Sequence, residues 1–560
     1  MKIKHLEKTI DKMMKNGFLD WADKLRGINK QVEIYLVGGA VRDALLGIKD
    51  IKDYDFVILG IGLERLGKEL EKLGRVNLVG KHFGVYKFIP KNKKLEAAYD
   101  IALPRTEISK AIGGYRDFDV KYDENLDIRE DLGRRDFTVN AMAYDIFNKK
   151  LVDEFGGVKD LEDKIIRTVG NGYERFEEDY SRMLRAIRFA CQLDFKIEEI
   201  TWKAIKKLMA HINDTRGNKI HTNKIQNPRP PTRPPASSLA GEVGRVGWSL
   251  KATGGQAKSK IERIVPYESI ASELLKAFVL NPLHAFDLYD KSGAFEHLTP
   301  EILKMKECPQ PDNWHSEGDV WEHTRLCLKN LGSKTFAGRF DEPLIFLPKK
   351  QAAVNREQGF YYSAELVMAL LWHDTGKPYT ITTPEKDGTD RLRFNNHDVA
   401  SAKIAKENFE KLKLSAAPEF DFDIEKAVWL ISKHHLFDTK TINEMKNSTV
   451  EKYFFGERFS GENLLKMGFV DMSSSIRQDT GEGDVENFDM MLKRINELKK
   501  LGKDRKLPKA LINGNGVMRI LGIKPSKKVG KILGDLREKQ LAGEIKTKQE
   551  AKQEIKKLKD

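Results

Sequence analysis

Hydrophobic residues follow two different periods along this chain, a short β-like pattern in the first third and a helical pattern afterwards. Short apolar runs dominate between about residues 32 and 155, with helical stretches between them, which predicts a compact α/β unit. From Leu161 onward the helical period takes over. Before residue 30, apolar residues recur at helical spacing and predict one amphipathic helix, formed by Leu6, Ile10, Met13, Met14, Phe18, Trp21 and Leu25.

One segment, residues 214–258, has neither period. It contains Pro228-Arg-Pro-Pro-Thr-Arg-Pro-Pro followed by several glycines, is basic, and has few large apolar residues. Such a composition cannot form a core, and the segment is too long for an ordinary loop. We therefore expect a disordered insertion, and we favour an inert insertion over an RNA-binding tail.

The strand predicted at 32–37 ends in two glycines, Gly38 and Gly39. Glycine lets backbone N–H groups approach a polyanion closely, and a short helix predicted just after the turn would favour a phosphate at its start. Asp53 and Asp55 open the next predicted strand, 53–59, where period two directs both carboxylates to one face. Two carboxylates beside a phosphate-binding turn suit a pair of Mg²⁺ ions in phosphoryl or nucleotidyl transfer.

Arginines follow in two further motifs. Arg134 and Arg135 stand near acidic residues, and guanidinium forks match the oxygens of a triphosphate. A predicted helix then carries a ladder in steps of three residues, in which a carboxylate beside an arginine fork can hydrogen-bond a base edge: Asp179, Arg182, Arg185 and Arg188. Surface ion pairs are the plainer interpretation of both motifs.

A second group of chemical residues lies between Trp314 and Arg477, where half of the 12 histidines fall. Imidazoles and carboxylates spread over several helices are typical ligands of Mn, Fe, Ni, Co or Mg ions. The most specific element is His373-Asp374 at the end of an apolar run, although a single histidine is more often structural.

Composition narrows the class of protein. The 560 residues predict several domains, and the formal charge of +14 favours a polyanionic partner such as nucleic acid. There is no apolar stretch long enough to span a bilayer and no secretory core at the start. Cys191, Cys308 and Cys327 are widely spaced and form no disulfide or metal pattern, which indicates a reducing cytoplasm.

The motifs from Gly38 to Arg188 resemble the class II tRNA nucleotidyltransferase and bacterial poly(A) polymerase family of the polymerase-beta superfamily. The likeness runs from 34 to 208 and resumes from 261 to 560. It implies an α+β fold, with an N-terminal polymerase-beta-like nucleotidyltransferase head followed by an all-α neck, body, HD domain and tail. The expected divisions are the N-terminal helix 1–30, head 31–158, neck 159–213, insertion 214–258, body 259–310, HD domain 311–477 and tail 478–560.

The resemblance also implies roles for residues of the head and neck. Asp53 and Asp55 would hold two catalytic Mg²⁺ ions, and Asp100 would be the third carboxylate, which activates the primer 3′-hydroxyl. The triphosphate and ribose would contact Gly38, Gly39, Arg42 and Arg135. The base of the incoming CTP or ATP would pair with Asp179 and Arg182, and the nucleotide would also contact Arg185 and Arg188.

The histidine-rich block resembles the HD phosphohydrolase superfamily, which certain tRNA nucleotidyltransferases carry as an added domain. The resemblance implies that His323, His373, Asp374 and Asp471 bind Mg²⁺ or a divalent transition metal (Ni²⁺, Mn²⁺, Co²⁺ or Fe²⁺). Substrate or a second metal would then contact His397, His434 and His435. A degenerate, metal-free helical domain is the alternative.

The expected function is therefore addition of C and A residues to the 3′ end of tRNA from CTP and ATP, with an HD domain that processes phosphate ends. A bacterial poly(A) polymerase shares every motif of the head. An HD-type hydrolase whose head only binds RNA, and a non-catalytic RNA-binding module, are less favoured because both sets of metal ligands are present. The motifs resolve neither CCA from CC-only or A-only addition nor the oligomeric state.

Overall fold

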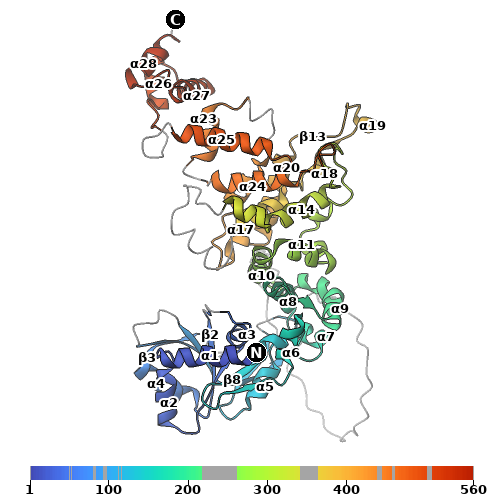
Figure 1. The fold of residues 1–560 in the computed structure, drawn as a ribbon, viewed down its shortest axis with the longest axis vertical. Helices are drawn as coiled ribbons and strands as arrows, with labels where there is room; N and C mark the ends of the chain where they lie inside the picture. Colours follow the sequence, from blue (N-terminus) through green and yellow to red (C-terminus); the bar gives the residue numbers. More distant parts are fainter. Residues whose placement is uncertain are drawn as a thin grey trace, which may run out of the picture.

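The computed structural model describes residues 2–48, 51, 53–79, 84–91, 98–110, 112–114, 117–216, 262–340, 363–437, 444–456, 459, 461–500 and 508–558. The molecule is elongated, with the N-terminal head at one end and the C-terminal helices at the other (Figure 1). Helical units occupy the length between them, so the α+β organisation expected from the sequence is confirmed.

The head is built on one seven-stranded mixed sheet, in which the predicted strands at 32–37 and 53–59 are confirmed as β1 and β2. Its spatial order is β3 (Gly74–Val79), β4 (Val85–Pro90), β5 (Tyr99–Ala102), β2 (Tyr54–Leu59), β1 (Glu33–Val37), β8 (Ala143–Asp145) and β9 (Lys150–Val152). A separate ribbon pairs β6 (Arg105–Ser109) with β7 (Phe118–Tyr122). Because β2 lies between antiparallel β1 and parallel β5, its start is central in the sheet.

Helices cover the sheet and bury an aromatic core against it. Trp21 packs edge-on against Phe56, with ring centroids 5.2 Å apart, and against Phe88 at 5.6 Å. The head helices are α1 (Lys2–Lys15), α2 (Asp20–Ile28), α3 (Gly39–Leu45), α4 (Leu63–Leu73), α5 (Ile128–Gly133), the 3₁₀ turn η1 (Thr138–Asn140) and α6 (Gly157–Asp163).

The prediction of a single N-terminal helix is wrong, because α1 and α2 are separate helices. Gly17 takes the left-handed conformation with φ 73°, a common way to end a helix. Phe18 N–H then donates to Met13 O at 2.9 Å, and the chain turns into α2. Apolar spacing cannot reveal this break, since both helices bury their apolar faces in the same core.

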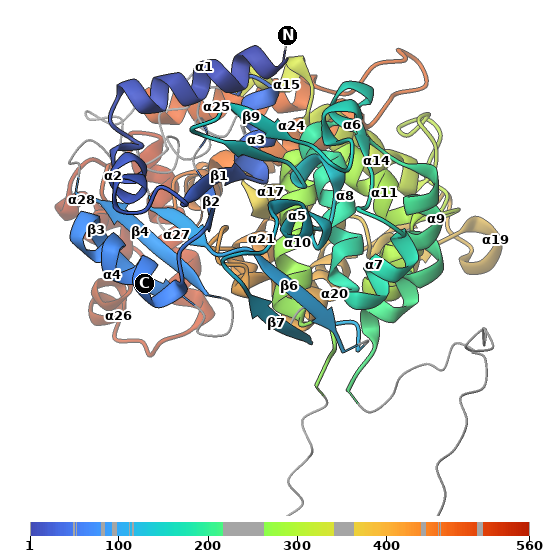
Figure 2. The same ribbon diagram turned by 90° about the horizontal axis from the view of Figure 1, so that it is seen from below.

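The neck and body continue from the head as packed helices, on the side of the sheet opposite β3 and β4 (Figure 2). The neck contains β10 (Ile165–Ile166), α7 (Gly172–Glu178), α8 (Ser181–Leu193), β11 (Lys196–Ile197), α9 (Glu199–Leu208) and the 3₁₀ turn η2 (Met209–Asn213). The body contains α10 (Tyr267–Leu280), α11 (Pro282–Lys291), α12 (Ala294–Leu298) and α13 (Pro300–Leu303). Helix α10 packs along α8, which brings body residues to the neck.

The two ends of the predicted insertion meet where the structure describes them. Thr215 forms an antiparallel bridge with Arg263, and Arg216 N–H donates to Glu262 O at 2.8 Å. Residues 217–261, which carry nearly all of the predicted insertion, lie outside the described residues. The neck and body are therefore already joined on either side of this segment.

We expect that replacing residues 217–261 by Gly-Gly leaves the protein folded and its catalytic turnover intact, because the flanking strands are within turn distance of each other. The segment carries eight Lys and Arg against one Glu. If these residues bind RNA, the deletion should weaken tRNA affinity and flatten its salt dependence, since fewer counterions are released. Thermal unfolding and filter binding at several salt concentrations measure both effects. An unfolded deletion variant would contradict the prediction.

The HD unit packs on the body and shares its hydrophobic core. Its elements are α14 (Val320–Leu331), α15 (Lys334–Phe340), α17 (Ala364–Trp372), α18 (Lys377–Thr380), β12 (Ile381–Thr382), α19 (Pro384–Asp387), β13 (Arg393–Phe394), α20 (His397–Lys411), η3 (Leu414–Ala416), α21 (Ile424–Ile431), η4 (His434–Phe437), α23 (Asn447–Phe454), α24 (Gly461–Ser474) and α25 (Glu486–Lys500). Helix α25, which the sequence division places in the tail, buries Phe488 against Phe469 at 5.3 Å and so extends this unit.

The last three helices form a small core of their own. They are α26 (Gly514–Leu521), α27 (Lys527–Leu541) and α28 (Lys548–Lys556), and they bury Val517, Ile532 and Ile555 together. Helix α27 contacts α23 through polar pairs such as Lys446 with Asp535 at 3.0 Å. The tail is thus a separate helical unit attached to the HD unit by ion pairs.

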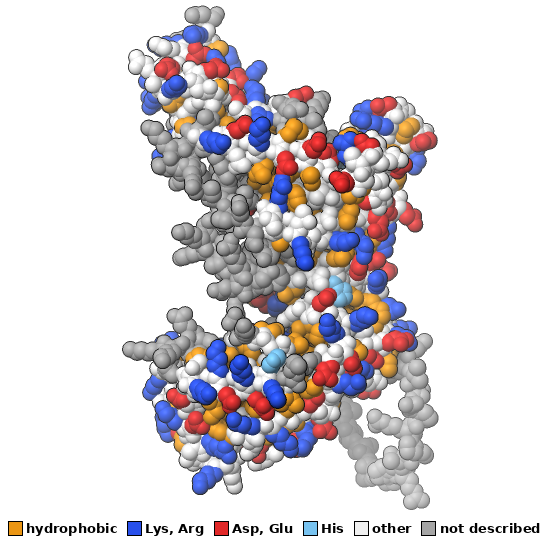
Figure 3. Space-filling model, in the orientation of Figure 1, with side chains coloured by type: hydrophobic (Ala, Val, Ile, Leu, Met, Phe, Trp, Pro, Cys, Tyr) orange, Lys and Arg blue, Asp and Glu red, His pale blue; other side chains and the backbone are white. Residues whose placement is uncertain are grey.

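Lysine and arginine side chains are scattered among acidic ones over the whole face drawn in Figure 3, from head to tail. A polyanionic partner bound to this face would meet positive charge along its length rather than at one patch. Among the described residues, no helix has both the length and the apolar character needed to cross a membrane.

Candidate active sites

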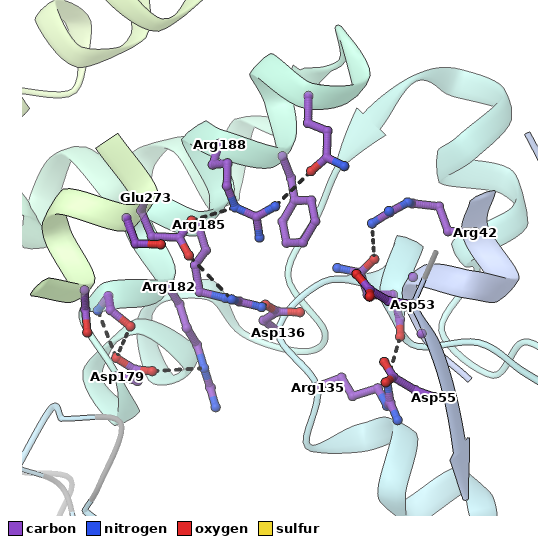
Figure 4. A pocket seen from close by; sticks show the side chains of 18 of the residues that line it. Arg42, Asp53, Asp55, Arg135, Asp136, Asp179, Arg182, Arg185, Arg188 and Glu273 are labelled. Atoms are coloured by element: carbon purple, nitrogen blue, oxygen red, sulfur yellow. Dashed lines mark hydrogen bonds and ion pairs between the residues drawn. The ribbon is translucent and has the colours of Figure 1, made fainter. Parts of the chain in front are cut away.

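A pocket of about 1210 Å³ lies where the head, neck and body meet. The glycine turn and the predicted aspartates supply its head side, and the arginines of α8 supply its neck side (Figure 4). Body residues Glu268 to Glu273 and the HD-unit residues Pro418 and Glu419 complete the wall. Every predicted residue of the head and neck lines this pocket except Asp100.

The glycine turn between β1 and α3 holds an arginine close to the backbone. Gly38 takes a φ of 68°, and a Cβ there would stand 2.8 Å from Arg135 Nη1. Only glycine fits this position without moving the guanidinium. Gly38 N–H donates to Met142 O at 3.1 Å, which ties the turn to β8. At this turn the backbone is therefore not covered by a side chain of its own, and the guanidinium of Arg135 lies beside it.

The carboxylates lie where β2 and β5 pair at the centre of the sheet, and Asp53 and Asp55 both line the pocket. Asp53 directly precedes β2, Asp55 lies within it, and Asp100 on β5 is paired in register with Asp55. Burial raises the pKa of Asp55, and the carboxylates of Asp100 and Asp53 add to this effect while Arg135 opposes it. Asp100 forms an ion pair with Lys87 at 3.0 Å. Crowded carboxylates of this kind gain from a bound cation.

Two of the arginines that line the head side of the pocket, Arg42 and Arg135, are each held by neighbours. Arg42 is 5% exposed and donates from Nη1 to Asn140 Oδ1 and from Nε to Asp43 Oδ1, both at 2.7 Å. Arg135 Nη2 lies 3.4 Å from Asp131 Oδ2. Fixed guanidinium groups of this kind suit phosphate oxygens.

The predicted ladder on one helix needs a correction at its first residue. Asp179 lies between α7 and α8 in extended backbone (φ −155°, ψ 103°), and its Oδ1 accepts from Ser181 N–H at 2.9 Å and Ser181 Oγ–H at 2.6 Å. Asp179 therefore precedes α8, and its side chain bonds the first residue of that helix from outside. Arg182 Nη1 donates to Glu178 Oε2 at 2.7 Å, and its Nε lies 4.0 Å from Asp179 Oδ2. The two side chains still face the pocket together (Figure 4).

Two acidic residues that the sequence analysis did not select hold the remaining arginines. Arg185 Nη2 donates to Asp136 Oδ2 at 2.7 Å, and Arg188 Nε donates to Glu273 Oε2 at 2.6 Å. Although burial opposes it, Arg185 keeps the pKa of Asp136 below its usual value. Asp136 follows the Arg134-Arg135 pair directly, which was a usable signal. Glu273 lies 85 residues beyond Arg188 on α10, so no local pattern indicates it.

A second cluster lies inside the HD unit. Four buried or half-buried imidazoles direct Nε2 toward its aspartates and Nδ1 away from them. The Nδ1 atom of each faces an oxygen at 2.7–2.8 Å: Glu317 Oε1 for His323, Leu370 O for His373, Phe394 O for His397 and Ile431 O for His434. Each Nδ1 therefore donates a hydrogen bond to its oxygen, which leaves Nε2 as the ring atom on the side of the carboxylates. This orientation is the one that metal-ligating histidines take.

Aspartates lie between these Nε2 atoms. Asp471 Oδ1 stands 3.0 Å from His323 Nε2 and 3.6 Å from His373 Nε2. Asp374 reaches both sides, with Oδ2 3.3 Å from His373 Nε2 and Oδ1 3.5 Å from His397 Nε2 and 3.7 Å from His434 Nε2. Two groups of potential metal ligands result around these aspartates, one of His323, Cys327, His373 and Asp471, the other of Asp374, His397 and His434. A third group, His315, Glu317 and His323, adjoins the first through His323.

The charges of this cluster also suit a cation. Burial lowers the pKa of His434 to about 3, helped by His397 and His373, so its ring stays neutral and able to bind a metal. Burial acts against protonation of His373 as well, yet Asp374 and Asp471 raise its pKa to about 10. The carboxylates therefore attract positive charge to the centre of the cluster.

One predicted residue stays outside the cluster, and three others join its surroundings. His435 is 44% exposed at its side chain and pairs with Asp398 at 3.3 Å. Lys377 Nζ lies 2.7 Å from Asp374 Oδ2, and Glu317 orients His323. Cys327 joins the ligand group, contrary to the prediction that the cysteines form no metal pattern. Its spacing of four from His323 on α14 was the available signal.

Comparison with known proteins gives the same two domains. The poly A polymerase head domain matches residues 34–167, and the HD domain matches residues 361–463. A multifunctional CCA protein of Herminiimonas arsenicoxydans is 29% identical over 384 residues, 68% of this chain and 70% of its own length. A CCA-adding enzyme of Enterococcus faecalis is 41% identical over 196 residues, 34% of this chain and 44% of its own length.

Solved structures show the same fold at low sequence identity. The Bacillus stearothermophilus CCA-adding enzyme in complex with CTP matches with a TM-score of 0.54 at 18% identity, covering 100% of this chain and 97% of its own. A CCA-adding enzyme in complex with ATP matches with a TM-score of 0.53 at 20% identity, over 98% and 95% of the two chains.

Proposed function

We propose that this chain is a member of the class II tRNA nucleotidyltransferase and poly(A) polymerase family and adds CMP and AMP to the 3′ end of tRNA from CTP and ATP. The observation that carries the proposal is that one pocket contains the glycine turn, the Asp53–Asp55 pair and the arginines of α8. The relatives named as CCA proteins favour this activity over poly(A) synthesis. An intact carboxylate pair argues against a head that only binds RNA.

The reaction follows from what the residues present to a nucleoside triphosphate. Asp53 and Asp55 would hold Mg²⁺, which neutralises phosphate charge and favours attack by the primer hydroxyl. Gly38 and Gly39 leave the backbone open to the triphosphate, and Arg42 and Arg135 supply fixed positive charge for its oxygens. Asp100 is paired in register with Asp55 but does not line the pocket. For Asp100 to accept the proton of the primer hydroxyl, its ion pair with Lys87 would first have to break.

Base selection would come from protein hydrogen bonds instead of a nucleic-acid template. Asp179 presents carboxylate oxygens, and Arg182 presents donors, from a rigid helix start. Burial raises the pKa of Asp179. Asp136 and Glu273 hold Arg185 and Arg188 in place behind them, so these arginines keep a fixed position on the pocket wall.

We expect Arg182→Ala to reduce discrimination among nucleotides more than it reduces triphosphate binding, because the side chain faces the base side of the pocket. Removing one hydrogen-bonding partner in a closed site costs about 1–3 kcal/mol, or about 5- to 150-fold in selectivity. Ratios of kcat/KM for CTP against UTP measure it. Arg182→Lys, which keeps the charge but loses the fork, should also lose selectivity. An unchanged ratio with uniformly weaker binding of every nucleotide would oppose the base-reading role.

Equilibrium binding of the four nucleotides tests the proposed substrates without turnover. Calorimetric titration of the full-length protein with Mg²⁺ should give tighter binding of CTP and ATP than of UTP and GTP. Binding of ATP alone would favour the poly(A) polymerase alternative, and equal binding of all four would refute base selection by the pocket.

The HD cluster supports a second, metal-dependent hydrolysis of a phosphoester or 2′,3′-cyclic phosphate end. His323, His373, Asp374 and Asp471 would hold a divalent transition metal or Mg²⁺, which would supply an activated water. His397 and His434 would bind substrate or a second ion, whereas His435 is directed toward Asp398 instead. Lys377 is placed to contact phosphate oxygens beside Asp374.

A further inference from the structure

We propose that Cys327 is a sulfur ligand of the HD metal centre, which makes one side of the centre selective for Zn²⁺, Co²⁺ or Fe²⁺ over Mg²⁺. The inference rests on the metal dependence proposed above. It concerns the donor group of His323, Cys327, His373 and Asp471, in which each residue offers one ligand atom and all four atoms lie within 4.8 Å of one another.

The fold places this thiol against the first histidine of the cluster. His323 and Cys327 lie four residues apart on α14, so both project from one face of the helix. Cys327 Sγ stands 3.5 Å from His323 Nε2, the same atom that faces Asp471 Oδ1 at 3.0 Å. The sulfur and the carboxylate oxygen therefore both lie next to one imidazole nitrogen, close enough together for one ion to contact all three atoms.

The same group contains a buried nitrogen without a hydrogen bond. His373 is 0% exposed, and among the described residues its Nε2 makes no hydrogen bond, since Asp374 Oδ2 at 3.3 Å and Asp471 Oδ1 at 3.6 Å give it ion-pair contacts only. A buried nitrogen without a hydrogen bond is unfavourable, so such an atom in a native cluster needs an explanation. A metal ion bound by His323, Cys327, His373 and Asp471 would give this nitrogen a partner.

The surroundings support ligation through Nε2 and Sγ together. Glu317 Oε1 accepts from His323 Nδ1 at 2.8 Å, and this carboxylate–histidine arrangement commonly orients metal ligands. Cys327 is itself 0% exposed, whereas a reactive redox thiol needs solvent access. A ligand role explains this position better than a role in thiol chemistry.

The donor set then decides which ions bind. Metal binding would release the thiol proton to solvent, and the thiolate would join the imidazoles of His323 and His373 and the carboxylate of Asp471. Asp374, whose Oδ2 lies 3.3 Å from His373 Nε2, would stand between this ion and the second group. Thiolate and imidazole donors suit Zn²⁺ and similar ions, whereas Mg²⁺ prefers oxygen ligands. The second group, Asp374, His397 and His434, contains no sulfur. The two sides of the cluster therefore differ in the metals that they favour.

X-ray absorption at the zinc edge tests the ligand directly. The measurement uses full-length protein carrying Asp53→Ala and Asp55→Ala, so that zinc reports the HD cluster alone, loaded with one equivalent of Zn²⁺. We expect a zinc–sulfur distance of about 2.3 Å in addition to shorter nitrogen and oxygen distances. Cys327→Ser should lose the sulfur signal. Cys191→Ser, which alters a buried cysteine of the neck, should keep it.

The outcomes separate this proposal from the one on which it rests. Full zinc occupancy without a sulfur neighbour, or a sulfur signal that persists in Cys327→Ser, overturns the ligand role and leaves the metal centre standing. Failure of the protein to bind any divalent ion overturns both. The presence or absence of the sulfur signal is measured first in protein that retains Cys327. The proposal can therefore be judged even if the Cys327→Ser variant does not fold.

Discussion

Asp55→Ala should lower nucleotide addition by at least about a thousandfold while tRNA binding stays near the wild-type value. Asp55 lies on the pocket wall at the centre of the sheet, beside Asp53, where both would hold Mg²⁺ at the reacting phosphate. Metal stabilisation of transition-state charge is worth several kcal/mol, and each 1.36 kcal/mol changes the rate tenfold. RNA affinity should come from the dispersed basic surface and survive. Single-turnover addition and filter binding measure the two quantities.

The control for this prediction is Asp23→Ala, which removes an exposed carboxylate from α2 of the same head and should leave both quantities unchanged. Asp53→Ala should behave like Asp55→Ala. Addition by either variant at close to the wild-type rate would remove the basis for a metal-dependent reaction at this site.

His373→Ala should remove hydrolysis by the HD unit and leave nucleotide addition nearly unchanged. His373 is fully buried between Asp374 and Asp471, so its loss leaves two carboxylates without their shared neighbour and weakens metal binding strongly. Mutation of a residue that only hydrogen-bonds a metal ligand lowers metal affinity or activity by about 10- to 100-fold. Loss of a residue that binds the metal directly should lower them further. Asp55→Ala should show the reverse pattern of activities.

The matched control is His435→Ala, because this neighbouring histidine points to Asp398 and stays outside the cluster. It should retain hydrolysis. Assays with Mn²⁺ or Ni²⁺ for hydrolysis of a 2′,3′-cyclic phosphate and with Mg²⁺ for addition compare the variants. If folded His373→Ala lost both activities, the two sites would be coupled, a possibility raised by the contact of Glu419 with Ser272 at the pocket wall.

Local patterns in the sequence predicted the parts of the sites that depend on short-range geometry. The glycine turn and the aspartate pair follow from strand periodicity and from the backbone freedom of Gly38. Asp100 was selected as the third carboxylate that the family resemblance implies, and the structure pairs its strand with β2. Of the HD residues, the sequence pattern singled out His373-Asp374 at the end of an apolar helix, and the resemblance to the HD superfamily supplied the other ligands.

The rest depends on contacts between distant segments or on local breaks that periodicity does not reveal. Glu273 reaches Arg188 only because α10 packs on α8. The two residues are far apart in the sequence, so residue spacing does not predict their contact. Asp179 continues the three-residue spacing of the arginines, yet it lies before α8 and bonds the first residue of that helix, Ser181. Cys327 forms no cysteine-pair motif, so only its position one helical turn from His323 places it in the cluster.

The most direct test of the central claim is the product pattern on tRNA that lacks its 3′ CCA end. The protein is incubated with Mg²⁺ and with CTP alone, ATP alone or both, and the products are resolved at single-nucleotide length. The account predicts that CTP alone adds C residues only, that both nucleotides together complete CCA, and that extension then stops. A long ladder of A residues from ATP alone, or no extension with any nucleotide, would contradict it.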